Sequence, residues 1–173
     1  METTSEVSLS DDTCMLAWRA FIQAHSALIS ILEHELETEK GLPLSQYEVL
    51  LRLNLSPERR MRMQDLAGSI LLSKSGVTRL VDRMVDAGLV QRAACDSDRR
   101  VTYAAITEKG RGVLADAAPV HLKGIEEHFS KFLSQDEAKV VSTALLKVFR
   151  HAAGELNAAS NTGEVAGAAA SLD

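Results

Sequence analysis

Hydrophobic and polar residues alternate at helical spacing along most of the chain. Between residues 13 and 40, apolar residues such as Phe21 and Leu28 recur at roughly every third or fourth position. This period predicts one long first helix, capped by one of residues 11–13. The Gly-Leu-Pro sequence at residues 41–43 is expected to end it.

Two shorter helices are predicted next. Ser45, with Glu48 three residues later, has the sequence of a capping box and is expected to open a second helix. Residues 54–60 contain a Ser-Pro pair and predict a turn. Residues 63–70 then predict a short third helix.

A fourth helix is predicted between Ser73, which is placed to cap it, and Gly88, which suits a left-handed C-terminal stop. At 100° per residue, one narrow face of this helix is apolar and consists of Val77, Leu80, Val81 and Met84. The opposite face is polar and consists of Ser75, Arg79, Asp82, Arg83 and Asp86. The small Ala67 of the third helix allows close packing on the apolar face. A short helix, a tight turn and a helix with a polar outer face predict a helix-turn-helix.

The period changes after the fourth helix. Residues 89–94 and 100–106 predict two short strands, joined by a polar hairpin loop at 95–99. Thr107 is expected to start another helix, which Pro119 should bend or interrupt. The predicted fold class is therefore mainly α with a small β-hairpin.

The end of the chain predicts one more helix and a tail. Ser134 and Glu137 have the sequence of a second capping box, which opens a final helix. Residues 157–173 are rich in Ala, Gly, Ser and Asn, and we expect a disordered tail there.

The polar residues of the fourth helix and the hairpin suit contact with DNA. The start of the helix offers amides and hydroxyls to phosphates, and arginines on its outer face reach phosphates or guanine edges. In the hairpin, Asp98 can hold Arg100 by a charge-assisted hydrogen bond. The candidate DNA contacts are Ser73, Lys74, Ser75, Thr78, Arg79, Arg83, Asp98, Arg99 and Arg100. The alternative is an ordinary solvated amphipathic helix beside a charged turn.

The distribution of charge supports a polyanionic partner for the middle of the chain. The whole chain has a formal net charge of −5. Residues 52–111 contain 12 Lys or Arg and 7 Asp or Glu, a net charge of +5, and the remainder has a net charge of −10. A basic middle between acidic flanks indicates that DNA contacts the middle alone. A solvated basic face is the simpler alternative.

Composition excludes several other classes of protein. The polar, acidic N-terminus lacks the pattern of a signal peptide, and no apolar run is long enough to predict a membrane span. The two cysteines, Cys14 and Cys95, stand far apart, which fits the reducing cytoplasm. No nucleophile–base pair, phosphate loop or metal cluster is evident, so we predict neither an enzyme nor a cofactor. His121 and His128 lie two helical turns apart, too far to share one ion unaided, and we predict no metal site.

Residues 63–110 closely resemble the MarR family of bacterial winged-helix regulators. The family's wing sequence of Asp-x-Arg followed by Leu-Thr-x-x-Gly is similar to residues 98–100 and 106–110 here, with Ile106 in place of leucine. The resemblance covers about residues 12–153. It implies a homodimer, more often a repressor than an activator, in which each subunit presents one winged helix to half of a palindromic operator.

The resemblance also implies a division of the chain. Residues 1–40 would form an N-terminal arm and dimerisation helix, residues 41–106 a winged helix-turn-helix, and residues 107–156 the C-terminal dimerisation helices. Residues 157–173 would be the tail.

Many relatives are released from DNA by a small aromatic or anionic effector bound between the two domains. Trp18 could stack on such a ligand, His25 could line the pocket, and Arg52 could bind a carboxylate. The simpler interpretation is that Trp18 packs in the dimer core, His25 is a partly buried interface residue and Arg52 is a surface or phosphate-facing residue. Two further readings remain open: a redox-sensing regulator that uses Cys14 or Cys95, and a helical protein-interaction module that does not bind DNA.

Overall fold

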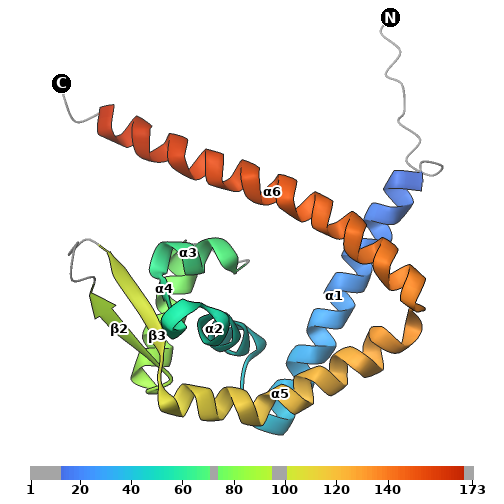
Figure 1. Ribbon diagram of the computed structural model, residues 1–173, viewed down its shortest axis with the longest axis horizontal. Helices are drawn as coiled ribbons and strands as arrows, with labels where there is room; N and C mark the ends of the chain where they lie inside the picture. The colour runs from blue at the N-terminus through green and yellow to red at the C-terminus, as the bar shows by residue number, and fades with distance from the viewer. Residues whose placement is uncertain (1–12, 71–73, 95–100, 170–173) are drawn as a thin grey trace, which may run out of the picture.

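The computed structural model describes residues 13–70, 74–94 and 101–169, with the backbone alone at residue 74 and over 156–169. Figure 1 shows a group of short helices beside a small sheet, and long helices that extend from it. The elements in chain order are α1 (Thr13–Lys40), α2 (Leu44–Leu55), the short 3-10 helix η1 (Pro57–Arg59), β1 (Arg60–Arg62), α3 (Met63–Ser69), α4 (Lys74–Asp86), β2 (Val90–Ala94), β3 (Thr102–Ile106), α5 (Glu108–His128), the 3-10 helix η2 (Ser130–Phe132) and α6 (Gln135–Ala169). The predicted fold class, mainly α with a small hairpin, is confirmed.

The sheet has three antiparallel strands in the order β1-β3-β2. The predicted hairpin is β2 and β3, in which Val90 pairs with Ile106 and Ala94 with Thr102. The sequence did not predict β1, whose Arg60 pairs with Ala105 on the other edge of β3. A three-residue strand has no usable period, and only its pairing with β3 defines it.

The hydrophobic core lies where α2, α3, α4 and the sheet meet. Its largest fully buried side chains are Leu36, Leu50, Leu53, Leu66, Leu80, Met84, Val49, Val77, Val81 and Val90. The four residues of the predicted apolar face of α4 are all among the buried residues. Leu36 of α1 and Leu114 of α5 extend this core into the long helices.

One prediction about a helix start is wrong. Ser45 does not cap α2, which begins one residue earlier, at Leu44, with Pro43 as the N-cap residue and no side-chain cap hydrogen bond. The backbone takes that role, because the Pro43 carbonyl accepts from the Gln46 amide at 2.9 Å and the Tyr47 amide at 3.1 Å. In contrast, the second predicted capping box is confirmed, since the Ser134 amide donates to Glu137 at 2.8 Å and the Glu137 amide to the Ser134 hydroxyl at 3.3 Å.

Two other helices continue where the sequence predicted an interruption or an end. Helix α5 runs through Pro119 as one helix of 21 residues. Pro119 is exposed, and buried Leu114, Ala117 and Gly124 hold the helix on either side of it. The backbone of α6 is helical as far as Ala169, past residue 157, where the sequence predicted a disordered tail. Alanine has the highest helix propensity, and this segment is rich in it.

Helix α1 is unusually apolar for its exposure. It is long and apolar enough to cross a membrane, with a mean hydropathy of 1.3 in its most apolar part, of which only 6% is buried. The sequence analysis predicted no such segment. Length and composition are weak evidence, because a helix whose apolar face is covered by another protein chain passes the same test.

Candidate nucleic-acid interface

Helices α3 and α4 pack as the helix-turn-helix that the sequence predicted. Leu66 of α3 is fully buried against the apolar face of α4, and Ala67 is half-buried beside it. This packing fixes the direction of α4 and turns its polar face outward. Ser75, Thr78, Arg79, Asp82, Arg83 and Asp86 are all exposed.

Helix α4 stops just before Gly88, which adopts the left-handed conformation that the sequence predicted. Gly88 has a φ of +70°, which glycine adopts without strain. The Gly88 amide donates to the Val85 carbonyl at 2.8 Å and the Leu89 amide to the Met84 carbonyl at 2.9 Å, which together make a Schellman-type stop. Lys109 donates to the Ala87 carbonyl at 2.8 Å and places a positive charge at the negative end of the helix.

Residues 106–110 and 87–89 together form what we call the α4–α5 junction. The Thr107 hydroxyl donates to the Gly88 carbonyl at 2.7 Å and accepts from the Gly110 amide at 3.0 Å, so one side chain both caps α5 and holds the end of α4. Gly110 is buried, and a Cβ atom there would lie 2.1 Å from the Leu89 carbonyl oxygen. The Thr-x-x-Gly sequence therefore has a physical reason: threonine supplies both hydrogen bonds, and only glycine fits against the strand entry.

The wing lies directly beyond the recognition helix α4. An ion pair of 2.8 Å joins Asp82 of α4 to Arg92 of β2. The local sequence around Asp82 did not indicate Arg92 as its partner, because the two residues come together only in the folded chain. This pair links the recognition helix to the first strand of the hairpin.

The sequence analysis missed three basic residues on the sheet. Arg60 lies with its guanidinium carbon 5.0 Å from the centre of the Tyr103 ring and also pairs with Glu58. Arg62 donates from its Nε atom to the Tyr103 hydroxyl at 3.3 Å. The sequence placed Arg60 in a predicted turn and Arg62 in no predicted element, because β1 has no recognisable period. Their positive charges lie on the same sheet as Arg92.

Some predicted DNA contacts lie outside the described residues. These are Ser73, Asp98, Arg99 and Arg100, and the redox candidate Cys95 also lies outside the described residues. Lys74 begins α4, and the structure describes only its backbone. The described contacts Ser75, Thr78, Arg79 and Arg83 share one exposed face of α4.

The three predicted effector residues do not converge within one protomer. Trp18 and His25 flank Phe21 on α1, at ring-centroid distances of 6.2 and 6.0 Å from it, and all three are exposed. Arg52 lies in α2 and pairs with Glu48 at 3.4 Å. The Nε atom of Arg52 is buried without a hydrogen-bond partner. Cys14 is exposed on the first turn of α1.

A polar cluster lies near Arg52, between α2 and α5. His121 of α5 packs against Tyr47 of α2, with 4.5 Å between ring centroids, and its Nδ1 atom is also buried without a partner. Burial lowers the pKa of His121, and the nearby Glu48 carboxylate opposes that shift. Burial, followed by the same carboxylate, raises the pKa of Tyr47.

The chain has the features of a winged helix-turn-helix protein. Helices α3 and α4 pack through their apolar faces, the polar face of α4 is exposed, and a three-stranded sheet adjoins it. Comparison with known proteins gives the family. The MarR family profile matches residues 40–101. The chain is 34% identical over 132 residues to the HTH-type transcriptional regulator MhqR of Bacillus subtilis, an alignment that covers 75% of this chain and 89% of that protein.

Solved structures agree with this assignment. AbsC, a MarR family transcriptional regulator from Streptomyces coelicolor, is 36% identical with a TM-score of 0.76, and the match covers 83% of this chain and 96% of AbsC. Sco3205 from the same organism, a MarR family transcriptional regulator in complex with DNA, is 31% identical with a TM-score of 0.74, covering 79% and 85% of the two chains. The protein therefore belongs to the MarR family of transcriptional regulators, as its sequence indicated, and is not an enzyme.

Proposed function

We propose that the protein is a cytoplasmic, homodimeric repressor that binds a palindromic operator and is released by a small effector. The observation that carries DNA recognition is the exposed face of α4, where Ser75, Thr78, Arg79 and Arg83 are accessible beside the wing. Phosphate-binding and base-reading groups on one solvated helix face suit entry into a major groove. Its relative Sco3205 is described in complex with DNA, which supports the same role here.

Arg79→Ala and Arg83→Ala test the recognition helix. A fragment that contains a palindrome from the protein's own upstream region is titrated by fluorescence anisotropy at several salt concentrations. A base contact predicts a loss of about 1–3 kcal/mol of binding free energy, and a phosphate contact predicts a salt slope smaller by about 1. Lys139→Ala removes an exposed positive charge at the start of α6 and serves as the matched control. Equal operator affinity in all three variants would refute the assignment of α4.

Arg100→Ala tests the wing in the same assay. Because an arginine at a wing tip clamps phosphates or enters the minor groove, we expect weaker operator binding with unchanged folding stability. Unchanged operator affinity would remove the wing tip from the mechanism.

A second copy of the chain would cover the exposed apolar faces of the long helices. On α1 these side chains are Leu16, Trp18, Phe21, Ile22, Ile29 and Ile31, and on α6 they are Val140, Leu145, Leu146, Val148 and Phe149. None of the side chains of α6 described between residues 135 and 155 is buried by its own chain. Exposed apolar side chains in this number on two long helices are typical of a protein–protein interface.

Leu145→Glu tests the dimer. A carboxylate on the apolar face of α6 would have to be desolvated in the interface, so we expect a monomer by light scattering at micromolar concentration. Lys147→Glu introduces the same side chain at another exposed position of α6 and should stay dimeric. A dimeric Leu145→Glu variant would show that α6 is not part of the interface.

For the effector, the structure favours Arg52 as the anion contact among the three candidates. Its unpartnered buried Nε atom can donate to a carboxylate, whereas Trp18 and His25 lie on the α1 face that a second copy would cover. An aromatic carboxylate such as benzoate should therefore weaken operator binding by the wild type and not by Arg52→Gln. An equal response in both proteins would exclude Arg52 as the contact.

A further inference from the structure

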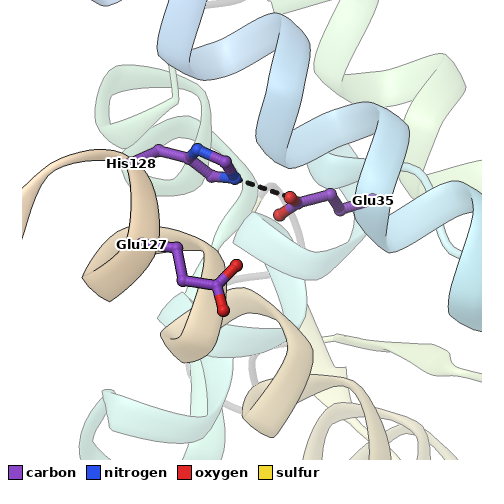
Figure 2. Close-up of side chains that lie close together, drawn as sticks. All are labelled: Glu35, Glu127 and His128. Carbon is purple, nitrogen blue, oxygen red and sulfur yellow. Dashed lines mark hydrogen bonds and ion pairs between the residues drawn. The ribbon is translucent and has the colours of Figure 1, made fainter.

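Three side chains with metal-binding atoms meet where α1 and α5 pack together. The His128 Nε2 atom lies 2.7 Å from the Glu35 Oε1 atom, and Glu127 precedes His128 on the last turn of α5. One ligand atom from each of Glu35, Glu127 and His128 lies within 4.8 Å of the others. Figure 2 shows His128 and Glu35 pointing toward each other from the two helices, with the Glu127 side chain beside them.

The backbone of α5 positions Glu35 in this cluster. Gly124 is buried one helical turn before His128, and a Cβ atom there would lie 2.5 Å from the Glu35 Oε2 atom and 2.6 Å from Leu32. A Cβ atom at residue 124 would have to push the tips of these two side chains aside, so glycine leaves room for the present position of the Glu35 carboxylate. One carboxylate oxygen of Glu35 therefore lies over Gly124 while the other faces the imidazole, and both Glu35 and His128 are half-buried.

We propose that Glu35, Glu127 and His128 form a binding site for a divalent transition metal ion such as Zn²⁺. One imidazole and two carboxylates are donors that Zn²⁺ accepts, at bond lengths of about 2.0–2.2 Å. Tetrahedral ligands at that range lie about 3.3–3.6 Å apart. The present separations, from 2.7 Å to at most 4.8 Å, bracket this value, so small side-chain movements are sufficient. Three protein ligands leave one position for water.

A simple ion pair between the helices explains Glu35 and His128 and does not need Glu127. The Glu127 side chain is 48% exposed, and its charged neighbour is Lys123, whose Nζ atom lies 3.8 Å away. Such a loose contact leaves the Glu127 carboxylate able to rotate toward the imidazole. A variant of Glu127 therefore distinguishes a metal site from a simple ion pair, because replacing this side chain does not disturb the packing between α1 and α5.

The experiment compares Glu127→Gln with Glu126→Gln, a matched change at the neighbouring exposed carboxylate of α5. Full-length protein freed of metal by chelation is titrated with Zn²⁺ against a chromophoric chelator, and with Co²⁺ while visible absorption is recorded. We expect one ion per chain in the wild type and in Glu126→Gln. Glu127→Gln should bind at least about tenfold more weakly, since the loss of even an outer partner of a metal site has that effect.

A further variant, Glu35→Gln, removes a second ligand while an amide can still hydrogen-bond to His128. It should lose affinity to at least the same extent and remain folded by circular dichroism. No bound ion in the wild type would overturn the proposal. Equal affinities in Glu127→Gln and Glu126→Gln would also overturn it, because binding would then occur at other histidines of the chain.

Discussion

Replacing Gly110 by alanine tests the α4–α5 junction most directly. The added Cβ atom would lie 2.1 Å from the Leu89 carbonyl oxygen, 2.9 Å from Ile106 Cγ1 and 3.1 Å from the Leu89 carbonyl carbon. Two of these three atoms belong to the backbone, which cannot rotate away as the tip of a long side chain can. The Leu89 carbonyl also accepts from the Thr107 amide at 3.1 Å, so moving it strains the hydrogen bond that joins the strand entry to α5.

The expected magnitude follows from two opposing effects. Alanine is favoured over glycine inside a helix by about 1 kcal/mol. A carbon–oxygen contact of 2.1 Å must lengthen by roughly 1 Å, and overpacking of a well-packed core costs typically 1–3 kcal/mol and sometimes more. At Gly112, two residues later in α5, a Cβ atom would meet nothing within 4 Å, so only the favourable effect remains. Because the propensity gain is common to both variants, their free energies of unfolding should differ by the overpacking cost, about 1–3 kcal/mol, with Gly110→Ala the less stable.

Urea denaturation followed by circular dichroism measures this difference. All proteins are compared at one chain concentration, because a dimer's stability depends on concentration. The folded fraction of Gly110→Ala should also bind operator more weakly, since the displaced carbonyl lies at the end of α4. If Gly110→Ala and Gly112→Ala unfold at the same urea concentration, the steric account of Thr-x-x-Gly is incorrect.

Three smaller predictions concern single side chains. Burial lowers the pKa of His121 in the folded protein, so the contribution of its neutral form to stability is complete above the unfolded pKa of about 6.5. This contribution falls as the pH drops below that value. The thermal midpoint declines between pH 7.5 and 5 for this reason, and His121→Phe should remove that part of the decline. A decline of equal size in both proteins would contradict it. Ser134→Ala removes the cap of α6 and should lower the free energy of unfolding in urea by about 1 kcal/mol, whereas a loss near zero would show that the cap is not stabilising. Asp82→Asn breaks a partly exposed ion pair and should change the free energy of unfolding by less than about 1 kcal/mol. It should alter operator affinity more than Asp86→Asn does. Equal operator affinities in the two variants would show that the ion pair has no role in DNA binding.

The parts of the fold that the sequence predicted depend on signals within a few residues. The apolar period gave the buried face of α4, because residues three and four apart share a side of any helix. The stop at Gly88 and the caps at Thr107 and Ser134 were predicted for the same reason: each is a contact between residues at most a few positions apart. The helix-turn-helix and its exposed polar face followed from these local features.

The parts that the sequence did not predict depend on contacts between distant residues. Strand β1 exists through its pairing with β3, and Arg92 finds Asp82 only once β2 has turned back along α4. Glu35 and His128 are 93 positions apart, so no spacing along the chain connects them. The effector candidates show the same limit, since Trp18 and Arg52 each suit a ligand by residue type and yet lie on different helices.

Helix α5 connects these distant contacts to the DNA-binding face. One end is joined to α4 through Thr107 and Gly110, and the other packs on α1 through Gly124 and His128. Its 21 residues span about 30 Å at 1.5 Å per residue. A tilt of about 5° at the α1 end therefore moves the start of α5, and α4 with it, by roughly 2–3 Å. In the proposed dimer, two recognition helices would have to lie about 34 Å apart to read successive major grooves, so a displacement of that size in each subunit would change the fit to an operator. Under these proposals, a metal ion or effector that altered the angle between α1 and α5 would change DNA binding without touching α4.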